Sequence, residues 1–126
     1  MTLRSVLIVD DNPTIRRVIC ELFQREGDFE VCGEAENGQE AIEKALDLKP
    51  VLIVTDLSMP VMNGLVATRI FRKLMPRVPI ILYSAHIDPH VEREALAAGA
   101  SAVIPKSDAV AVLIARSRTL LRNLAA

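Results

Sequence analysis

Short apolar runs alternate along the chain with longer segments whose apolar residues recur every three or four positions. The short runs are rich in Val and Ile and too brief for helices, so they predict β-strands. Five strands are expected, at residues 6–9, 31–33, 51–54, 79–83 and 102–104. The longer segments predict helices at residues 12–25, 39–48, 65–74 and 90–98, and from about residue 108 onward.

The first predicted helix shows this periodicity most fully. Its apolar stripe follows the spacing of an amphipathic helix and consists of Ile15, Val18, Ile19, Leu22 and Phe23. Asn12 is a typical N-cap, and Pro13 suits the first helical turn. Gly99 closes the fourth helix in the same way that breakers close the others.

Strict alternation of strand and helix predicts an α/β fold with a parallel sheet covered on both faces. Five such units suit the flavodoxin-like, doubly wound sheet of strand order 2-1-3-4-5 with five helices. Ligands of such folds bind beyond the carboxyl ends of the strands, where the first and third strands meet. Because the sequence has no internal repeat or linker, we expect one domain over residues 1–126.

Composition narrows the function classes. The chain has 126 residues, of which 51% are hydrophobic, so it can form one core without disulfides or structural metal. A net charge of −1 argues against a nucleic-acid or membrane surface built from bulk charge. Cys20 and Cys32 lie in apolar-periodic segments and are expected to be reduced packing residues. With no signal peptide or membrane span in the pattern, we expect a cytoplasmic protein without a membrane partner.

The predicted strand ends carry the chemistry. Asp10 and Asp11 follow the first strand, Asp56 the third, Ser84 the fourth and Lys106 the fifth. All these ends meet at one edge of a parallel sheet, and three carboxylates in one small cleft repel one another unless a cation joins them. Oxygen ligands without His or Cys favour a hard ion, and a site with few protein ligands favours Mg²⁺ over Ca²⁺.

Each of these residues alone has an ordinary explanation. An Asp or Ser after a strand is usually a turn former or helix cap, and a lone Lys is usually solvated. The ordinary explanation requires four independent coincidences at the same sheet edge. The combination therefore predicts a functional site.

Several motifs together resemble the receiver domains of two-component response regulators. They are Asp10-Asp11, the run Asp56-Leu57-Ser58-Met59-Pro60-Val61-Met62-Asn63-Gly64, Ser84-Ala85, Gly99-Ala100 and Lys106. The resemblance covers nearly the whole chain, and the Asp-x-x-Met-Pro-x-Met-x-Gly segment is its most specific part. The amino-acid sequence of these motifs is most similar to that of LuxR-type, NarL-like regulators with a helix-turn-helix output.

The resemblance implies a role for each matching residue. Asp56 would accept a phosphoryl group from the phosphohistidine of a sensor histidine kinase. Mg²⁺ would be bound directly by Asp11, Asp56 and the backbone carbonyl of Ser58, and through water by Asp10. The domain would be a regulatory phosphoacceptor rather than an enzyme, with only self-catalysed phosphorylation and dephosphorylation.

The resemblance also implies a switch. Lys106 and the Ser84 hydroxyl would bind the phosphoryl oxygens, and the small Ala85 would leave room for the group. The added charge would then change the face formed by the fourth helix, the fifth strand and the fifth helix. Relatives usually have a moving aromatic residue at the switch position that Val103 occupies here, so we expect signalling to rely more on backbone shifts.

Two further positions differ from, or vary within, the family. Ser107 follows Lys106 where many relatives have proline, so we expect a trans peptide bond there. His86 and Ser58 occupy positions that tune water attack on the phosphate in relatives. We expect His86 to be a solvated side chain rather than a catalyst.

Three other functions fit parts of the pattern. A Mg²⁺-dependent aspartyl phosphohydrolase would need a second Asp two residues after the nucleophile, where this chain has Ser58. A flavodoxin would need a phosphate loop where Asp10 and Asp11 would repel phosphate. An interaction domain that is never phosphorylated would not need the complete set of site residues.

The sequence contains no effector domain, so the chain is expected to be either a stand-alone receiver or a receiver cut after its fifth helix, and analogy with the LuxR type favours the second. By analogy with the LuxR type, we expect the output to be transcription through a separate C-terminal helix-turn-helix domain that would make any DNA contact. A homodimer is plausible for such regulators. The apolar start of the fifth helix, residues 109–112, is a candidate contact face.

Overall fold

The computed structural model describes residues 3–125, and residues 1, 2 and 126 of the predicted domain lie outside the described part. Five strands form one sheet in which every neighbouring pair is parallel. They are β1 (Arg4–Val9), β2 (Phe29–Ala35), β3 (Leu52–Thr55), β4 (Ile80–Ser84) and β5 (Ala102–Pro105). Their order is β2-β1-β3-β4-β5, which confirms the predicted flavodoxin-like fold.

Five helices connect and follow these strands. They are α1 (Pro13–Arg25), α2 (Gly38–Leu48), α3 (Gly64–Leu74), α4 (Pro89–Ala98) and α5 (Val110–Ala125). Side chains cap the first four at their N-termini: Asn12, Asn37, Asn63 and Asp88 each accept a hydrogen bond from a backbone N–H of the first turn.

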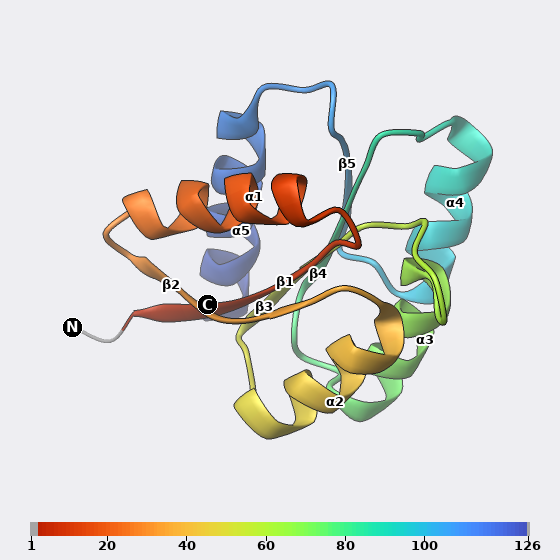
Figure 1. The fold of residues 1–126 in the computed structure, drawn as a ribbon, viewed down its shortest axis with the longest axis horizontal. Helices are drawn as coiled ribbons and strands as arrows, with labels where there is room; N and C mark the ends of the chain where they lie inside the picture. Colours follow the sequence, from red (N-terminus) through yellow and green to blue (C-terminus); the bar gives the residue numbers. More distant parts are fainter. Residues whose placement is uncertain (1–2, 126) are drawn as a thin grey trace.

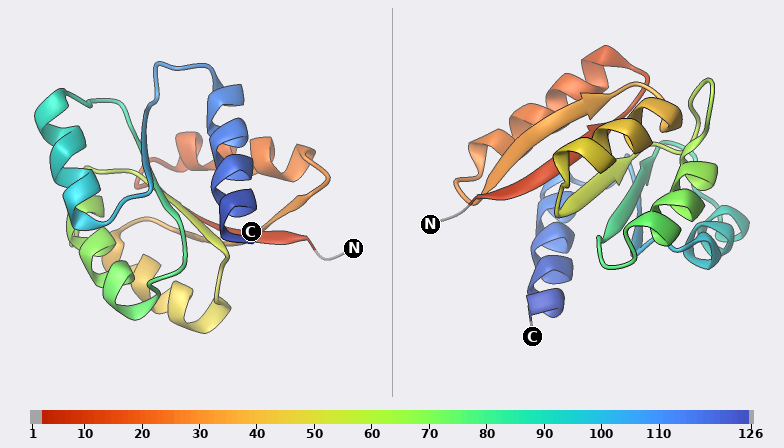
Figure 2. Two further views of the ribbon diagram at one scale, coloured as in Figure 1. Left: turned by 180° about the vertical axis from the view of Figure 1, so that it is seen from behind. Right: turned by 90° about the horizontal axis from the view of Figure 1, so that it is seen from below.

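The helices cover both faces of the sheet. Helices α1 and α5 lie on one face, and α2 and α3 lie on the other, with α4 beside α3 (Figures 1 and 2). Alternate residues of β1 show the same division. Val6 and Ile8 enter the core that packs against α1 and α5, whereas Leu7 and Val9 enter the core that packs against α2 and α3. Strand β1, which has a neighbour on each side, is therefore buried on both faces, as in other parallel sheets.

The two ends of the fold are tied together by one arginine. Arg118 of α5 donates hydrogen bonds to Glu26 and to both carboxylate oxygens of Asp28, at 2.7–3.0 Å. Its guanidinium also lies 5.8 Å from the ring centroid of Phe29, at the start of β2. The last helix is thus joined to the entry of the edge strand.

The predicted element bounds differ from the observed ones mainly at the edge strand. Strand β2 runs from residue 29 to residue 35, two residues longer at each end than predicted. Its polar residues Glu30 and Glu34 interrupt the Val and Ile run that marks the buried strands. Helices α2 and α3 each begin one residue earlier than predicted, at Gly38 and Gly64, because glycine is not a usual helix start.

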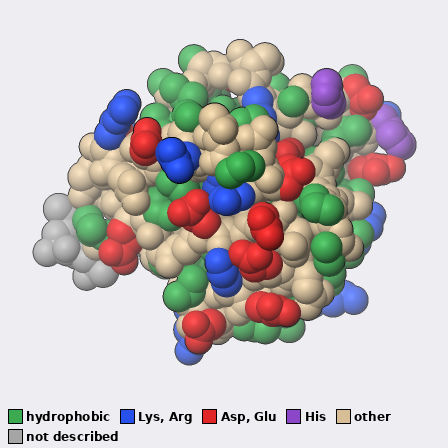
Figure 3. All heavy atoms as spheres, viewed as in Figure 1, with side chains coloured by type: hydrophobic (Ala, Val, Ile, Leu, Met, Phe, Trp, Pro, Cys, Tyr) green, Lys and Arg blue, Asp and Glu red, His purple; other side chains and the backbone are tan. Residues whose placement is uncertain are grey.

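Both cysteines are free packing residues, as predicted. Cys20 is buried between α1 and the sheet, and burial raises the pKa of its thiol to about 12. Cys32 packs against the core on the α2 and α3 face. On the face seen in Figure 3, acidic and basic side chains are interspersed rather than gathered into a field of one sign. None of the helices in the described part of the chain is long and apolar enough to cross a membrane.

Candidate phosphoacceptor and metal site

Three carboxylates meet at the carboxyl edge of the sheet. Asp10 and Asp11 follow β1, and Asp56 follows β3, the strand that pairs with β1. Each offers a carboxylate oxygen, and these oxygens lie within 4.8 Å of one another. The structure thus brings together the three acidic residues that the sequence predicted at one edge.

Asp10 is the buried member of the group, with 1% of its surface exposed. Its Oδ1 accepts a hydrogen bond from the backbone N–H of Asn12 at 2.9 Å, and its Oδ2 accepts one from Lys106 Nζ at 2.7 Å. Asp11 is exposed, and its carboxylate has no hydrogen-bond partner in the part of the chain that the structure describes. The pair therefore offers one fixed and one accessible carboxylate.

Asp56 is half-buried, and hydrogen bonds with backbone groups of Val9 and Leu57 hold it in place. Its N–H donates to the carbonyl of Val9 at 2.9 Å, and its Oδ1 accepts from the N–H of Leu57 at 2.7 Å. The next helix approaches this strand end closely. The N–H of Gly64 donates to the carbonyl of Leu57 at 2.7 Å, and a Cβ at Gly64 would collide with the carbonyl of Asp56.

Lys106 extends from the end of β5 into the acidic group. Its Nζ lies 2.7 Å from Asp10 Oδ2 and 3.2 Å from Asp56 Oδ2. Burial disfavours the ammonium ion, but the hydrogen bond with Asp10 and the charge of Asp56 outweigh this effect, and the pKa of Lys106 is raised. Lys106 is therefore a cation that bridges two carboxylates of the group.

Ser84 ends β4 next to this lysine. The N–H of Lys106 donates to the Ser84 carbonyl at 2.8 Å, which fixes the two strand ends side by side. The Ser84 residue is buried, and its hydroxyl makes no hydrogen bond within residues 3–125. A hydroxyl without a partner is free to rotate toward an oxygen that enters the site.

The other predicted positions lie around this centre. Val103 is half-buried and packs against the small core under α4. His86 and Ala85 are exposed, and the Lys106–Ser107 peptide bond is trans, as predicted. Ser58 is exposed in the loop between β3 and α3.

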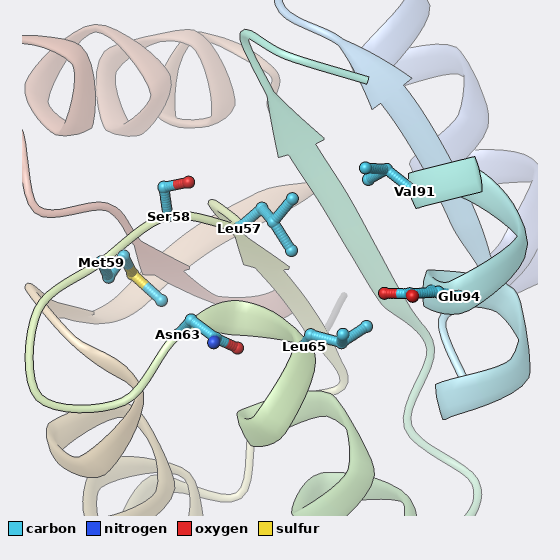
Figure 4. A pocket seen from close by; sticks show the side chains of 7 residues that line it. All are labelled: Leu57, Ser58, Met59, Asn63, Leu65, Val91 and Glu94. Carbon is cyan, nitrogen blue, oxygen red and sulfur yellow. The ribbon is translucent and has the colours of Figure 1, made fainter. Parts of the chain in front are cut away.

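A hollow lies between that loop and α4. Ser58 and Asn63 line it from the loop, and Val91 and Glu94 line it from the helix (Figure 4). Its wall is a mixture of small polar and apolar groups without the converging charges of the acidic centre. The charged groups that could carry out chemistry therefore lie in the acidic centre and not in this hollow.

One residue that contacts the site, Arg16, was not predicted from the sequence. Arg16, in the first turn of α1, donates from Nη1 to the backbone carbonyl of Asp10 at 2.7 Å. Its position in the sequence could have indicated such a contact, because a cation near a helix N-terminus is electrostatically disfavoured without a partner.

The chain matches known proteins over nearly its full length. A family model described as the response regulator receiver domain matches residues 6–118. One curated relative, protein-glutamate methylesterase/protein-glutamine glutaminase 4 of Hahella chejuensis, is 41% identical over 109 residues. That match covers 85% of this chain but 28% of the relative, so the chain spans less than a third of the relative's length.

Solved structures match the fold as closely. A two-component response regulator of the LuxR family from Aurantimonas sp. SI85-9A1 has a TM-score of 0.92 at 28% identity, covering 97% of this chain and 87% of that one. The response regulator domain of Thermotoga maritima CheB has a TM-score of 0.90 at 30% identity, covering 96% and 98%.

Proposed function

Because the chain belongs to the family of response regulator receiver domains, we propose that Asp56 accepts a phosphoryl group from a sensor histidine kinase. The observation that carries this proposal is the meeting of Asp10, Asp11, Asp56 and Lys106 at one sheet edge. Receiver domains are phosphorylated by histidine kinases, so the donor would be a phosphohistidine of such a kinase.

The chemistry is a nucleophilic substitution at phosphorus. A carboxylate oxygen of Asp56 forms a bond to phosphorus while the bond to the kinase histidine nitrogen breaks, and the imidazole keeps the electron pair. Lys106 lies beside Asp56 and would hold a phosphoryl oxygen with its ammonium group. Ser84 would donate its unpartnered hydroxyl to a second phosphoryl oxygen.

The acidic group fits a hard divalent cation. Its donors are all oxygens, and their separation of at most 4.8 Å lets one ion contact them. Asp11, Asp56 and the Ser58 carbonyl would bind Mg²⁺ directly, and Asp10 would bind it through water. When bound, Mg²⁺ would offset charge on the transferring phosphoryl group.

Phosphorylation would act on the surface through Ser84 and Lys106. Ser84 ends β4 and Lys106 directly follows β5, the two strands that α4 connects, and Val103 packs beneath that helix. New hydrogen bonds to the phosphoryl group would move the loop after β4 and change the face of α4, β5 and α5. Val103→Tyr tests the role of the missing aromatic: we expect it to alter phosphorylation-dependent dimerisation or output, and equal behaviour to the wild type contradicts the proposal.

The phosphoacceptor role is tested by intact mass after treatment with acetyl phosphate and Mg²⁺. We expect a labile gain of one phosphoryl group that requires Mg²⁺ and is lost in Asp56→Asn. Asp47→Asn is the matched control, because Asp47 is an exposed carboxylate on α2, away from the site. The absence of any adduct would favour an interaction domain that is never phosphorylated. Steady release of phosphate from an ester would favour a phosphohydrolase.

The output module is a separate question, and the relatives bear on it. The curated relative at 41% identity is a protein-glutamate methylesterase/protein-glutamine glutaminase, whereas the LuxR-family structure is 28% identical. We therefore propose that the output is control of a methylesterase, in place of the transcriptional output that the sequence motifs suggested. In the relative, this chain matches only 28% of the length. Methylesterase activity would belong to the region of the relative outside that match.

Transcriptional output through a helix-turn-helix domain remains the second candidate, supported by the LuxR-family structural match. Purification of the native protein with an antibody against this chain, followed by peptide sequencing, distinguishes the two. Esterase-domain peptides would support methylesterase control, and helix-turn-helix peptides would support transcription. We further propose a cytoplasmic location, where kinase and Mg²⁺ are both available, and a homodimer through the exposed residues 109–112.

A further inference from the structure

Arg16 makes two contacts that reach across the carboxyl edge of the sheet. Its Nη1 donates to the backbone carbonyl of Asp10 at 2.7 Å, and its Nε donates to Glu34 Oε1 at 3.0 Å. Asp10 follows β1 and Glu34 lies near the end of β2. The side chain is 18% exposed, so the guanidinium is held in a partly desolvated place between two strand ends and a helix.

This placement is unfavourable for the helix itself. Arg16 is the fourth residue of α1, and a positive charge in the first turn opposes the helix dipole. Arg17, one position later, is exposed and contacts no acidic group in the described part of the chain. The two contacts of Arg16 are therefore what holds this cation at the N-terminus of α1, next to the acidic group.

The carbonyl that Arg16 holds belongs to the peptide between Asp10 and Asp11. Since a peptide unit is planar, fixing the Asp10 carbonyl also fixes the N–H and the Cα of Asp11, which lie in the same plane. The Asn12 N–H closes the other side of this turn by donating to Asp10 Oδ1 at 2.9 Å, whereas the Asp11 carboxylate is exposed and has no hydrogen-bond partner among residues 3–125. The backbone alone positions this carboxylate.

We propose that Arg16, oriented by Glu34, is a positioning residue that holds the Asp10–Asp11 turn in the geometry required for cation binding. The inference rests on the proposed function, in which Asp10, Asp11 and Asp56 bind Mg²⁺. A guanidinium suits the task because its planar fork contacts a carbonyl and a carboxylate at once, which a lysine ammonium on a flexible stem does less well.

Charge and positioning predict opposite effects, which makes the inference testable. Removing a positive charge beside three carboxylates strengthens their attraction for Mg²⁺ through Coulomb forces alone. Losing the positioning contact weakens Mg²⁺ binding, because groups that orient metal ligands contribute about tenfold or more to affinity. The sign of the change therefore separates the two roles.

The experiment measures the Mg²⁺ dissociation constant of the unphosphorylated protein from amide NMR shifts of residues around Asp11 and Asp56. Arg16→Ala is compared with Arg17→Ala, which removes the same charge from the same helix without the contacts. We expect about tenfold weaker binding in Arg16→Ala and unchanged or slightly tighter binding in Arg17→Ala. Glu34→Gln should weaken binding less, and Arg16→Lys should restore part of the loss.

Equal or tighter Mg²⁺ binding in Arg16→Ala than in Arg17→Ala overturns the inference. Thermal unfolding without Mg²⁺ identifies a variant that fails to fold, in which case Glu34→Gln and Arg16→Lys decide the matter. If the wild type itself binds no Mg²⁺, the proposed function fails rather than the role of Arg16. The two failures are thus distinguishable.

Discussion

One residue in the loop after β3 has an unusual backbone conformation. Val61 has φ of 67° and 82% of its surface exposed. A β-branched residue in the left-handed region is strained, and the left-handed conformation costs roughly 1–2 kcal/mol for residues with a Cβ. The strain is not repaid by burial of the side chain.

Val61→Gly is therefore expected to stabilise the fold. Glycine removes the strain but gains freedom in the unfolded chain, so we expect a net increase of about 0.5–1 kcal/mol in the free energy of unfolding. Urea denaturation measures this change. Val61→Ala is the control, because alanine keeps the Cβ and should recover little of the strain. A glycine variant that is less stable than the alanine variant would contradict the explanation.

Gly64 is required by space rather than by its φ angle. An added Cβ would overlap the carbonyl of Asp56 and approach the Cα of Leu57, which are backbone atoms that cannot turn away. We expect Gly64→Ala to lower the free energy of unfolding by about 2–3 kcal/mol. Gly27→Ala is the matched control, since a Cβ there would meet nothing within 4 Å. Similar losses in both variants would show that the close approach to the Asp56 carbonyl is not responsible, because the entropy of the unfolded chain favours alanine over glycine at both positions.

At the scale of elements, the helices differ in how firmly they are packed. Helix α4 buries only two alanines, Ala95 and Ala98, whereas α1 buries Ile19, Cys20 and Phe23. The C-terminal end of α4 is better held, because Arg72 of α3 donates two hydrogen bonds to the Gly99 carbonyl, at 3.0 and 2.6 Å. The N-terminal half of α4 is thus the weakly anchored end.

Amide hydrogen exchange tests this difference. Segments with few buried apolar contacts open at lower free energy, so α4 should exchange at least about tenfold faster than α1. Within α4, exchange should be fastest in the N-terminal half. Mass spectrometry of peptic peptides or NMR gives both comparisons. Equal protection of α1 and α4 would mean that helix burial does not govern local opening in this fold.

The number and order of the elements could be predicted from the sequence because buried parallel strands and amphipathic helices leave distinct patterns. The ends of β2 could not, since edge residues such as Glu30 and Glu34 are polar like loop residues. The converging residues Asp10, Asp56 and Lys106 followed from the fold rule for strand ends. Arg16 and the left-handed Val61 depend on three-dimensional contacts and backbone angles that no spacing encodes.

At the scale of the whole molecule, segments that are distant in the sequence meet both at the carboxyl ends and at the amino ends of the strands. The site joins strand ends that lie near residues 10, 56, 84 and 106, so it forms only when the sheet is complete. Away from it, Arg118 of α5 joins the turn before β2 through Glu26 and Asp28. This second contact links the last helix to the first quarter of the chain and can be tested through global stability.

Asp28 provides that test through pH. Hydrogen bonds from Arg118 hold the pKa of Asp28 below its usual value of 3.8. A carboxylate with a lowered pKa in the folded state contributes stability that is present above the usual pKa and is lost as pH falls through the folded one. We expect Asp28→Asn to lower Tm by roughly 2 °C at pH 7, since the pair is partly exposed, and the difference from wild type to shrink below pH 3.8. Asp47→Asn, which removes an exposed carboxylate on α2, should show no such pH-dependent difference. Thermal unfolding between pH 7 and pH 3 measures all three proteins, and a Tm difference for Asp28→Asn that persists unchanged at the acid end would mean that the contact stabilises by packing rather than by charge.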